Sequence, residues 1–500
     1  MEVQARSVDR SGASLFAMEF CMLVRLLCSF CLLFVTVRSA SADDSLDATI
    51  LEMRLNEVLD AHPTAKRTTV TLKVVDLESG ETLYDRGGDR LQVPASNLKI
   101  YTSACALDTF GPDHRFQTIV RADGPIENGV LRGDLKLIGG GDAMLTSKDL
   151  QKLAKRVVDE LGIRQIIGGV VVDNSRYAPR LKGPGWMWDD EPSYYNMSVT
   201  PLMVDFNVLT VKLTPDAEGF VYAKLEPPSN YPELVSVGAD AAAGNELATR
   251  RPYTEPIEYR GDRKLDKPTE LRMTMHDPGP WVAGMLTQML AEAGVNFSPP
   301  SRKAVADAEG GVAARELVHV GPTLAETLKH FNHVSENAVG EVLLHEIALA
   351  RGVERPDWPE GAKAISKWLV EQAKLEPGSF RYVDGSGLSR YNLISADSSV
   401  RLLQYLKQSD DFEPFFQSLP TSEVKLDEAT LAGASDQSPA PRVSAKGGSM
   451  SSVSTMSGYL RTLDGRLLAF SLLANGFIGN NEPVFDLRQQ VWRELVRYRR

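Results

Sequence analysis

Three short segments that lie far apart in the sequence carry the residues that a single active site would need. In chain order they read Ser96-Asn97-Leu98-Lys99, Ser335-Glu336-Asn337 and Lys446-Gly447-Gly448-Ser449. They correspond to the patterns S-x-x-K, S-x-N and a variant of K-T-G, which together provide a serine nucleophile activated by lysine. Because only a fold that brings all three segments together could use them, they constrain the architecture more than any other feature.

The S-x-x-K pattern by itself says little, because it occurs both at Ser96 to Lys99 and at Ser422 to Lys425. Ser96 follows Pro94-Ala95 and opens a stretch, residues 97–107, that includes several apolar residues and neither glycine nor proline. This context predicts a buried helix with the serine in its first turn, so that Lys99 lies beside Ser96 on one face. Ser422 lies between a proline and a polar stretch, which predicts a surface turn.

The residue types in the three segments predict acyl transfer. A serine hydroxyl becomes a good nucleophile only when a neighbouring base removes its proton. Lys99 can be that base if burial or a nearby positive charge lowers its pKa, and Lys446 would supply the charge. Ser335 can both accept and donate a proton, so it would pass one toward the leaving amine. Asn337 would hold Lys99 and the substrate backbone through its amide.

Three further segments, rich in glycine or tryptophan, resemble those of one known family. They are residues 133–142, 185–190 and 384–390. With the three motifs and their long spacing, they make the chain similar to the low-molecular-weight class C penicillin-binding proteins. This is the D-alanyl-D-alanine carboxypeptidase/endopeptidase family, and the resemblance spans almost the whole chain after the first forty-odd residues.

The resemblance implies an α/β fold of the α+β type, similar to the penicillin-binding and serine β-lactamase-like transpeptidases. In that fold an antiparallel sheet is flanked by helices, and here a large β-rich domain is inserted. Hairpin signals at Ser79-Gly80 and Asp464-Gly465 predict that strands from both ends of the chain build the sheet. Lys446 to Ser449 would lie on its edge strand, facing the cleft.

We expect the catalytic penicillin-binding domain to comprise residues 43–117 and 274–500. The inserted domain or domains would comprise residues 118–273. A helix over residues 281–293 would return the chain to the catalytic domain.

The first residues, 1–42, predict a secretory signal peptide. Arg25 precedes an apolar run that is too short to span a bilayer, and Ala40-Ser41-Ala42 offers a cleavage site. An amphipathic anchor is the alternative. Export to the periplasm or cell envelope, with no stable membrane span, follows from the first interpretation. After cleavage Cys105 would be the one cysteine left, so an intrachain disulfide is excluded. Cys105 lies in the predicted helix after Leu98, where we expect it to be a buried helix residue.

One departure from the family pattern is Gly447, where the family has threonine or serine. The missing hydroxyl normally helps to bind the terminal carboxylate of the substrate, and losing such a bond costs about 1.5–3 kcal/mol. Ser449 keeps a hydroxyl on the same face of the predicted strand, and Ser451 continues it. We therefore predict weakened carboxypeptidase activity and slower β-lactam acylation. Alternatively, Gly447 only lets backbones pack closely, and Ser449 suffices.

The predicted substrate pocket combines the third motif with residues outside it. Asp189 and Asp190 could bind an amine on the peptide stem or lie in a surface turn, and Met450 could wall the pocket or pack in the core. The resemblance implies that Arg390 lines the substrate pocket; the alternative is a purely structural role in its loop. The full predicted set is Gly447, Gly448, Ser449, Met450, Asp189, Asp190 and Arg390.

Composition and the remaining motifs exclude other classes of protein. The net charge of −11 gives no basic footprint for nucleic acid. His330, His333 and His345 are close in sequence but lack an H-E-x-x-H pattern, so we predict neither a metal site nor another cofactor.

The sequence thus predicts a serine-type D-Ala-D-Ala carboxypeptidase or endopeptidase that hydrolyses peptidoglycan peptides and is acylated by β-lactam antibiotics. Two alternatives remain open: a β-lactamase or D-amino esterase on the same fold, and a weakly active or non-catalytic cell-wall-binding homologue, which Gly447 motivates.

Overall fold

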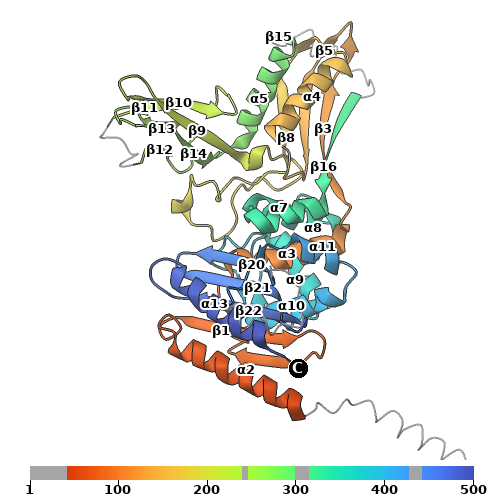
Figure 1. The fold of residues 1–500 in the computed structure, drawn as a ribbon. Helices are drawn as coiled ribbons and strands as arrows, with labels where there is room; N and C mark the ends of the chain where they lie inside the picture. The colour runs from red at the N-terminus through yellow and green to blue at the C-terminus, as the bar shows by residue number, and fades with distance from the viewer. Residues whose placement is uncertain (1–41, 239–245, 299–314, 427–441, 500) are drawn as a thin grey trace, which may run out of the picture.

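The computed structural model describes residues 42–238, 246–298, 315–426 and 442–499 (Figure 1). Apart from Ala42, the predicted signal peptide lies outside these residues. Within the described ranges, no helix combines the length and the apolar character needed to cross a membrane.

A six-stranded antiparallel sheet forms the centre of one lobe, the lower one in Figure 1. Its strands in spatial order are β19 (Thr421–Ser422), β20 (Val443–Met450), β21 (Val453–Arg461), β22 (Leu467–Asn475), β1 (Thr69–Asp76) and β2 (Thr82–Arg86). The first long strand of the chain pairs with the last, Val70 opposite Ala474, so both ends of the described chain share one sheet. This confirms the predicted antiparallel sheet.

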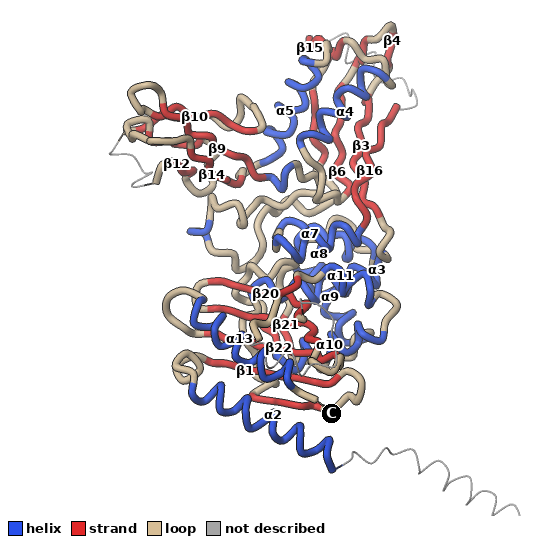
Figure 2. Tube along the Cα trace, in the orientation of Figure 1, coloured by secondary structure: helices blue, strands red, loops and turns tan. Residues whose placement is uncertain are grey.

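Helices cover both faces of this sheet, as Figure 2 shows. On one face α2 (Ala42–Ala61) and α13 (Glu482–Arg497) bury Leu55, Leu59 and Val491 against the strands. On the other face α10 (Ala396–Gln408) packs against β1, β21 and β22. Because β22 is covered on both faces, its run Leu467–Asn475 is apolar almost throughout rather than alternating.

A layer of helices completes this lobe on the side of α10. It consists of η1 (Ala95–Leu98), α3 (Lys99–Phe110), α7 (Leu324–Val334), α8 (Asn337–Ala350), α9 (Trp358–Glu371) and α11 (Phe412–Ser418). A two-stranded sheet of β17 (Phe380–Arg381) and β18 (Leu393–Ile394) joins α9 to α10. Trp358 and Trp368 of α9 are buried in this core together with α3 and α8.

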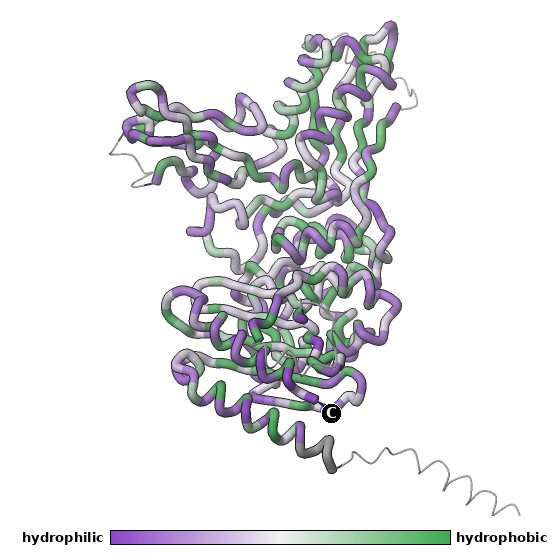
Figure 3. The backbone as a smooth tube through the Cα atoms, viewed as in Figure 1, coloured by the Kyte–Doolittle hydropathy of each residue, from purple (hydrophilic) through white to green (hydrophobic). Residues whose placement is uncertain are grey.

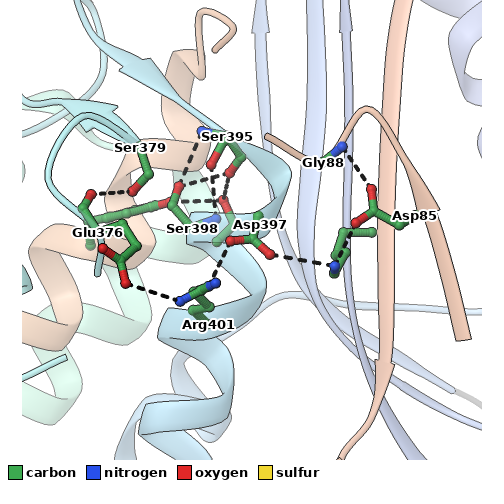
Figure 4. A network of polar contacts seen from close by, with 11 residues as sticks. Asp85, Gly88, Glu376, Ser379, Ser395, Asp397, Ser398 and Arg401 are labelled. Atoms are coloured by element: carbon green, nitrogen blue, oxygen red, sulfur yellow. Dashed lines mark hydrogen bonds and ion pairs between the residues drawn. The ribbon is translucent and has the colours of Figure 1, made fainter. Parts of the chain in front are cut away.

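Polar contacts tie the β1–β2 hairpin to α10 (Figure 4). Lys73 Nζ lies 2.6 Å from Asp85 Oδ2 and 3.5 Å from Asp397 Oδ1, and Arg401 Nε donates to Asp397 over 2.7 Å. The backbone N–H of Asp397 donates to the Gly88 carbonyl over 2.8 Å. These contacts position the segment that leads from β2 into η1.

The second lobe, at the top of Figure 1, has its own core and branches into two arms. One arm contains two sheets and two helices: β16-β3-β6-β8, β15-β7-β5-β4, α4 (Ser147–Asp159) and α5 (Pro278–Glu292). The strands of these sheets are β3 (Arg115–Asp123), β4 (Ile126–Glu127), β5 (Val130–Arg132), β6 (Asp134–Gly140), β7 (Gln165–Ile167), β8 (Val170–Asp173), β15 (Asn296–Ser298) and β16 (Arg315–Thr323).

The other arm contains two three-stranded sheets, ordered β10-β9-β14 and β11-β13-β12. Their strands are β9 (Val208–Pro215), β10 (Val221–Glu226), β11 (Leu234–Val237), β12 (Ala248–Arg250), β13 (Ile257–Arg260) and β14 (Thr269–Thr274). This β-rich lobe agrees with the fold class that the sequence predicted.

Helix α5 and strand β16 bear on the boundary that the sequence placed at residue 274. Helix α5, which was expected to return the chain to the catalytic domain, packs against α4 and β8, and Trp281 and Met285 lie in the second core. Apolar positions run along this helix in Figure 3. Strand β16 also pairs with β3 of the same lobe. An apolar helix face does not reveal which core it joins, and we propose that the inserted part extends to about Thr323.

If α5 belongs to the second core, Trp281→Ala should destabilise that lobe alone. The side chain is fully buried, so we expect the lobe to lose about 3–5 kcal/mol of unfolding free energy. Hydrogen exchange should then accelerate in α4, α5 and β8 but not in α8 and α9. The matched variant Trp368→Ala, in the first core, should give the reverse pattern. Equal acceleration in both lobes for either variant would contradict the assignment.

Candidate active site

Ser96 lies in the short helix η1, which leads directly into α3, where the sequence predicted the first turn of one buried helix. Ala95 adopts a φ of 49°, a left-handed conformation that alanine rarely takes. A Cβ atom on Gly387 would lie only 2.0 Å from the Ala95 carbonyl oxygen. The predicted glycine-rich loop, residues 384–390, therefore packs directly on the turn that carries Ser96.

Lys99, the first residue of α3, has a fully buried side chain with three hydrogen bonds. Its Nζ donates to Ser96 Oγ over 3.0 Å, to Asn337 Oδ1 over 2.7 Å and to the Ser386 carbonyl over 2.7 Å. Burial, and secondarily the positive charge of Lys446, lower the pKa of Lys99 to about 7. Near neutral pH a large fraction of this amine is therefore unprotonated, next to the serine hydroxyl.

The second motif forms the junction between α7 and α8. Ser335 ends α7 with a φ of 62°, and Glu336 begins α8 by accepting a hydrogen bond from the backbone of Ala338. Such left-handed residues cost on the order of 1–3 kcal/mol and often mark functional sites. Asn337 bonds Lys99 through Oδ1 and donates through Nδ2 to the Tyr195 carbonyl over 2.9 Å. It thus connects the buried lysine to the chain of the inserted part.

The third motif lies on β20, beside η1. Lys446 Nζ donates to Ser335 Oγ over 3.1 Å and to the Gly447 carbonyl over 2.8 Å. Asn97 Nδ2 donates to the Lys446 carbonyl over 2.7 Å, which joins the strand to η1. Burial lowers the pKa of Lys446 to about 8. A Cβ atom on Gly448 would lie 2.5 Å from the Pro94 carbonyl oxygen, so this close approach requires glycine.

The structure corrects two expectations about this edge of the sheet. Ser422 does not lie in a surface turn but in β19, which pairs with the first two residues of β20, Val443 and Ser444. Strand β20 is therefore the edge only beyond that short pairing, which still leaves residues 446–449 free to face the cleft.

Gly447 does not serve close backbone packing. The atom nearest to a Cβ built at this position is the methyl group of Met456, at 3.1 Å, and the nearest backbone atom, the Thr455 oxygen, is 3.6 Å away. Its φ also lies outside the left-handed region that favours glycine. A side chain could therefore be placed here with only a small movement of Met456.

The predicted site residues converge on one cavity of about 960 Å³. Of the predicted catalytic set, Ser96, Ser335, Asn337 and Lys446 line it, and Lys99 lies buried behind Ser96. The entire predicted substrate set also lines it: Gly447, Gly448, Ser449, Met450, Asp189, Asp190 and Arg390.

The inserted part and the glycine-rich loop meet at one side of this cavity. Asp190 accepts a hydrogen bond from the Tyr195 hydroxyl over 2.8 Å, and Trp186 Nε1 donates to Asp384 over 2.9 Å. Arg390 donates to the Ser451 carbonyl over 3.1 Å. The segments 185–190 and 384–390, which the sequence singled out separately, are thus joined by a direct hydrogen bond.

Two buried carboxylates hold the loop that accepts from Lys99: Asp384, in the predicted glycine-rich segment, and Glu341, which sequence reasoning missed. Glu341 accepts hydrogen bonds from the backbone of Ser386 over 2.8 Å and from Trp358 Nε1 over 2.7 Å. Asp384 accepts from the backbone of Gly387 over 2.8 Å. Burial, and then the charge of Asp384, raise the pKa of Glu341 to about 8. Glu341 lies in an ordinary helical run, so no sequence motif marks it.

Cavity residues from α13 were also missed. Phe485, Arg488, Gln489 and Trp492 line the same cavity from the last helix of the chain. They lie within an amphipathic pattern that predicts only a helix packed on the sheet.

The histidines and the cysteine that the sequence analysis considered do not line this cavity. His345 is buried and its Nδ1 lies 2.7 Å from the Glu341 carbonyl oxygen, while His330 stacks on Phe206. No group of three potential metal ligands occurs among the residues that the structure describes. Cys105 is a buried free thiol on α3, as predicted, and burial raises its pKa to about 12.

Comparison with known proteins gives consistent matches. The model of the D-Ala-D-Ala carboxypeptidase 3 (S13) family matches residues 51–493. The chain is 31% identical over 459 residues to a D-alanyl-D-alanine carboxypeptidase of Actinomadura sp. (strain R39), covering 88% of this chain and 84% of that protein. It is 24% identical over 443 residues to D-alanyl-D-alanine carboxypeptidase DacB of Haemophilus influenzae, and this match covers 85% of this chain and 90% of that protein.

A solved structure supports the same fold. The crystal structure of penicillin binding protein 4 (dacB) from Haemophilus influenzae matches with a TM-score of 0.73 at 21% sequence identity. The match covers 89% of this chain and 99% of that chain, and it confirms the predicted fold class.

The two lysines predict a bell-shaped pH dependence for attack by Ser96. Lys99 accepts a proton only when it is neutral, so the rate should rise with pH through about 7. Lys446 keeps its positive charge only below about 8, so the rate should fall above that pH. The measurement is the second-order rate constant of Ser96 acylation between about pH 5 and 10.

The variant Lys446→Met tests the coupling between the two amines. Without the second charge the pKa of Lys99 should be higher, so the rising limb should move to higher pH, in addition to any loss of rate. A rising limb that stays in place would show that Lys446 does not act on Lys99.

Proposed function

The chain belongs to the D-Ala-D-Ala carboxypeptidase 3 (S13) family, and we propose that Ser96 carries its acyl-transfer reaction. Serine acyl transfer is general to this family, so the protein is a serine-type D-Ala-D-Ala carboxypeptidase. The observation that carries the residue assignment is the fully buried amine of Lys99, 3.0 Å from Ser96 Oγ.

We propose the following steps. Ser96 Oγ attacks the carbonyl carbon of the scissile amide while Lys99 takes the hydroxyl proton. The C–N bond then breaks: Ser335 donates its proton to the leaving amine, and the proton that Lys99 took from Ser96 passes to Ser335, so Lys99 is neutral again. Lys446, 3.1 Å away, stabilises the charge that develops on Ser335. In the second half Lys99 takes a proton from the water that attacks the ester, and it returns this proton to Ser96 Oγ as the acyl bond breaks. Asn337 supports both the formation and the hydrolysis of the acyl-enzyme, because its hydrogen bond orients Lys99.

The proposed substrate is a peptidoglycan stem peptide or cross-link that contains a D-amino acid. The cavity has acidic residues, Asp189 and Asp190, at the side of the inserted part, and basic residues toward β20. We propose that an amine on the stem lies near the two aspartates, with Met450 and Arg390 beside it. The carboxyl end would then point toward Lys446.

A β-lactam would follow the same path but leave slowly, because its ring opens without releasing a separate leaving group. The Haemophilus influenzae penicillin binding protein 4 has been solved in complex with a β-lactam. Since peptidoglycan lies outside the cytoplasm, we also propose that residues 1–42 direct export to the periplasm or cell envelope.

Intact-mass analysis after incubation with a penicillin tests the nucleophile. The native protein should gain the mass of one penicillin, and Ser96→Ala should gain none. Ser422→Ala is the matched control, since Ser422 also begins an S-x-x-K pattern and lines the same cavity. An adduct that persists in Ser96→Ala would refute the assignment.

The same assay separates the alternatives. Rapid turnover of penicillin without cleavage of a D-Ala-D-Ala peptide would indicate a β-lactamase or D-amino esterase. No adduct in the native protein would indicate a cell-wall-binding homologue, as the Gly447 variant suggested.

Gly447→Thr tests the departure in the third motif. The new hydroxyl would offer a hydrogen bond to the substrate carboxylate, so acylation by penicillin should become up to about 10-fold faster. Space is available, because only the flexible end of Met456 lies within 3.4 Å of the new Cβ. Gly448→Thr is the control: its Cβ would lie 2.7 Å from the Asn97 nitrogen, so it should slow acylation. An unchanged rate for Gly447→Thr would mean that no hydroxyl is missing in function.

A further inference from the structure

Arg488, on α13, is a buried cation that lines the proposed substrate cavity. Only 6% of its surface is exposed. Its Nη1 lies 3.6 Å from the sulfur of Met456, and its guanidinium carbon lies 4.6 Å from the centre of the Phe485 ring. Within the described ranges no carboxylate forms an ion pair with it, and burial lowers its pKa to about 10.

Such a group is unusual in a folded protein, because buried charges are normally paired. Two other buried arginines of this chain follow that rule. Arg250 pairs with Glu191, and Arg260 Nε lies 2.7 Å from Asp262 Oδ1. Arg488 has a sulfur atom and an aromatic ring instead, and both are weak partners for a guanidinium. Its strong hydrogen-bond donors therefore remain available to a ligand in the cavity.

The sheet places Gly447 and Arg488 on the same side. Gly447 and Met456 are directly opposite each other in the pairing of β20 with β21, so they face the same way. Helix α13 covers that face, and Met456 contacts Arg488. Because Gly447 has no side chain, Met456 is the side chain that touches both positions. The Met456 side chain thus lies between the position of the missing hydroxyl and the guanidinium of Arg488.

Other polar groups at this end of the cavity are already engaged. The Ser449 hydroxyl accepts a hydrogen bond from Asn481, next to the start of α13. Lys446 donates to Ser335 and to the Gly447 carbonyl, and Arg390 donates to the Ser451 carbonyl. Among the cations that line the cavity, Arg488 alone has no oxygen partner within the described part of the chain.

We propose that Arg488 binds the carboxylate of the ligand, in place of the hydroxyl that Gly447 lacks. The ligand carboxylate is the C-terminus of a D-amino-acid peptide or the carboxylate of a β-lactam. The planar guanidinium matches a carboxylate with two parallel hydrogen bonds, which a hydroxyl cannot do. Met456, a flexible side chain, moves aside on binding. This assignment rests on the proposed function, because it concerns the same site.

The test compares acylation by benzylpenicillin with acylation by its methyl ester, which lacks the negative charge. The variant is Arg488→Met, which keeps an unbranched chain but removes the guanidinium. We expect its second-order rate constant for benzylpenicillin to fall about 10- to 100-fold. The rate constant for the methyl ester should stay within about twofold, because that ligand offers no carboxylate.

Arg493→Met is the matched control, since Arg493 lies on the same helix but lines a different cavity. It should change neither rate constant. The double variant Arg488→Met, Gly447→Thr should regain part of the lost rate, because the new hydroxyl would then be the main carboxylate partner.

An equal fall for both penicillins in Arg488→Met would assign Arg488 a structural role and overturn the proposal, as would no fall at all. If Arg488→Met does not fold, a crystal structure of the native penicillin adduct decides: the guanidinium should lie within hydrogen-bond distance of the carboxylate, and a carboxylate bound elsewhere overturns the proposal. Failure of the proposed function would look different, since the native protein would then form no adduct with either penicillin.

Discussion

The burial of the Lys99 amine is the constraint on which the rest of the site depends. A buried amine is stable only if its hydrogen bonds are satisfied, and here the partners come from three separate segments. They are Ser96 of η1, Asn337 of α8 and the carbonyl of Ser386 in the glycine-rich loop. Packing these segments around one amine both excludes water and brings together the groups of the proposed reaction.

Charges around this amine act in opposite directions, and their balance determines its protonation. Burial and the charge of Lys446 lower the pKa of Lys99, whereas Asp384 and Glu341 raise it. The first two effects dominate, so the amine can serve as a base near neutral pH. The same carboxylates hold the loop that contacts Lys99, and burial together with the charge of Asp384 keeps the pKa of Glu341 high. Structural support and electrostatic tuning are therefore provided by the same groups.

Much of the fold and the site could be predicted, because the relevant signals are local. The i, i+3 spacing of Ser96 and Lys99 places them side by side in any tight helical turn, and the structure has them 3.0 Å apart. The position of α5 was wrong, because an apolar helix face is compatible with either core. Glu341 and Arg488 were missed, because each lies in a helical run whose pattern gives no sign of function.

The sequence by itself determined which residue types are present for the proposed chemistry: a serine, a lysine three residues later, and a second serine and lysine in a fixed order along the chain. It also showed that Gly447 departs from the family pattern, because residue identity is visible without coordinates. Only the tertiary structure decided which side chains lie next to that glycine, namely Met456 and, in contact with it, Arg488. Arg488 reaches the cavity because α13 packs on the face of β20 and β21 that Gly447 shares, a contact between segments that no local pattern encodes.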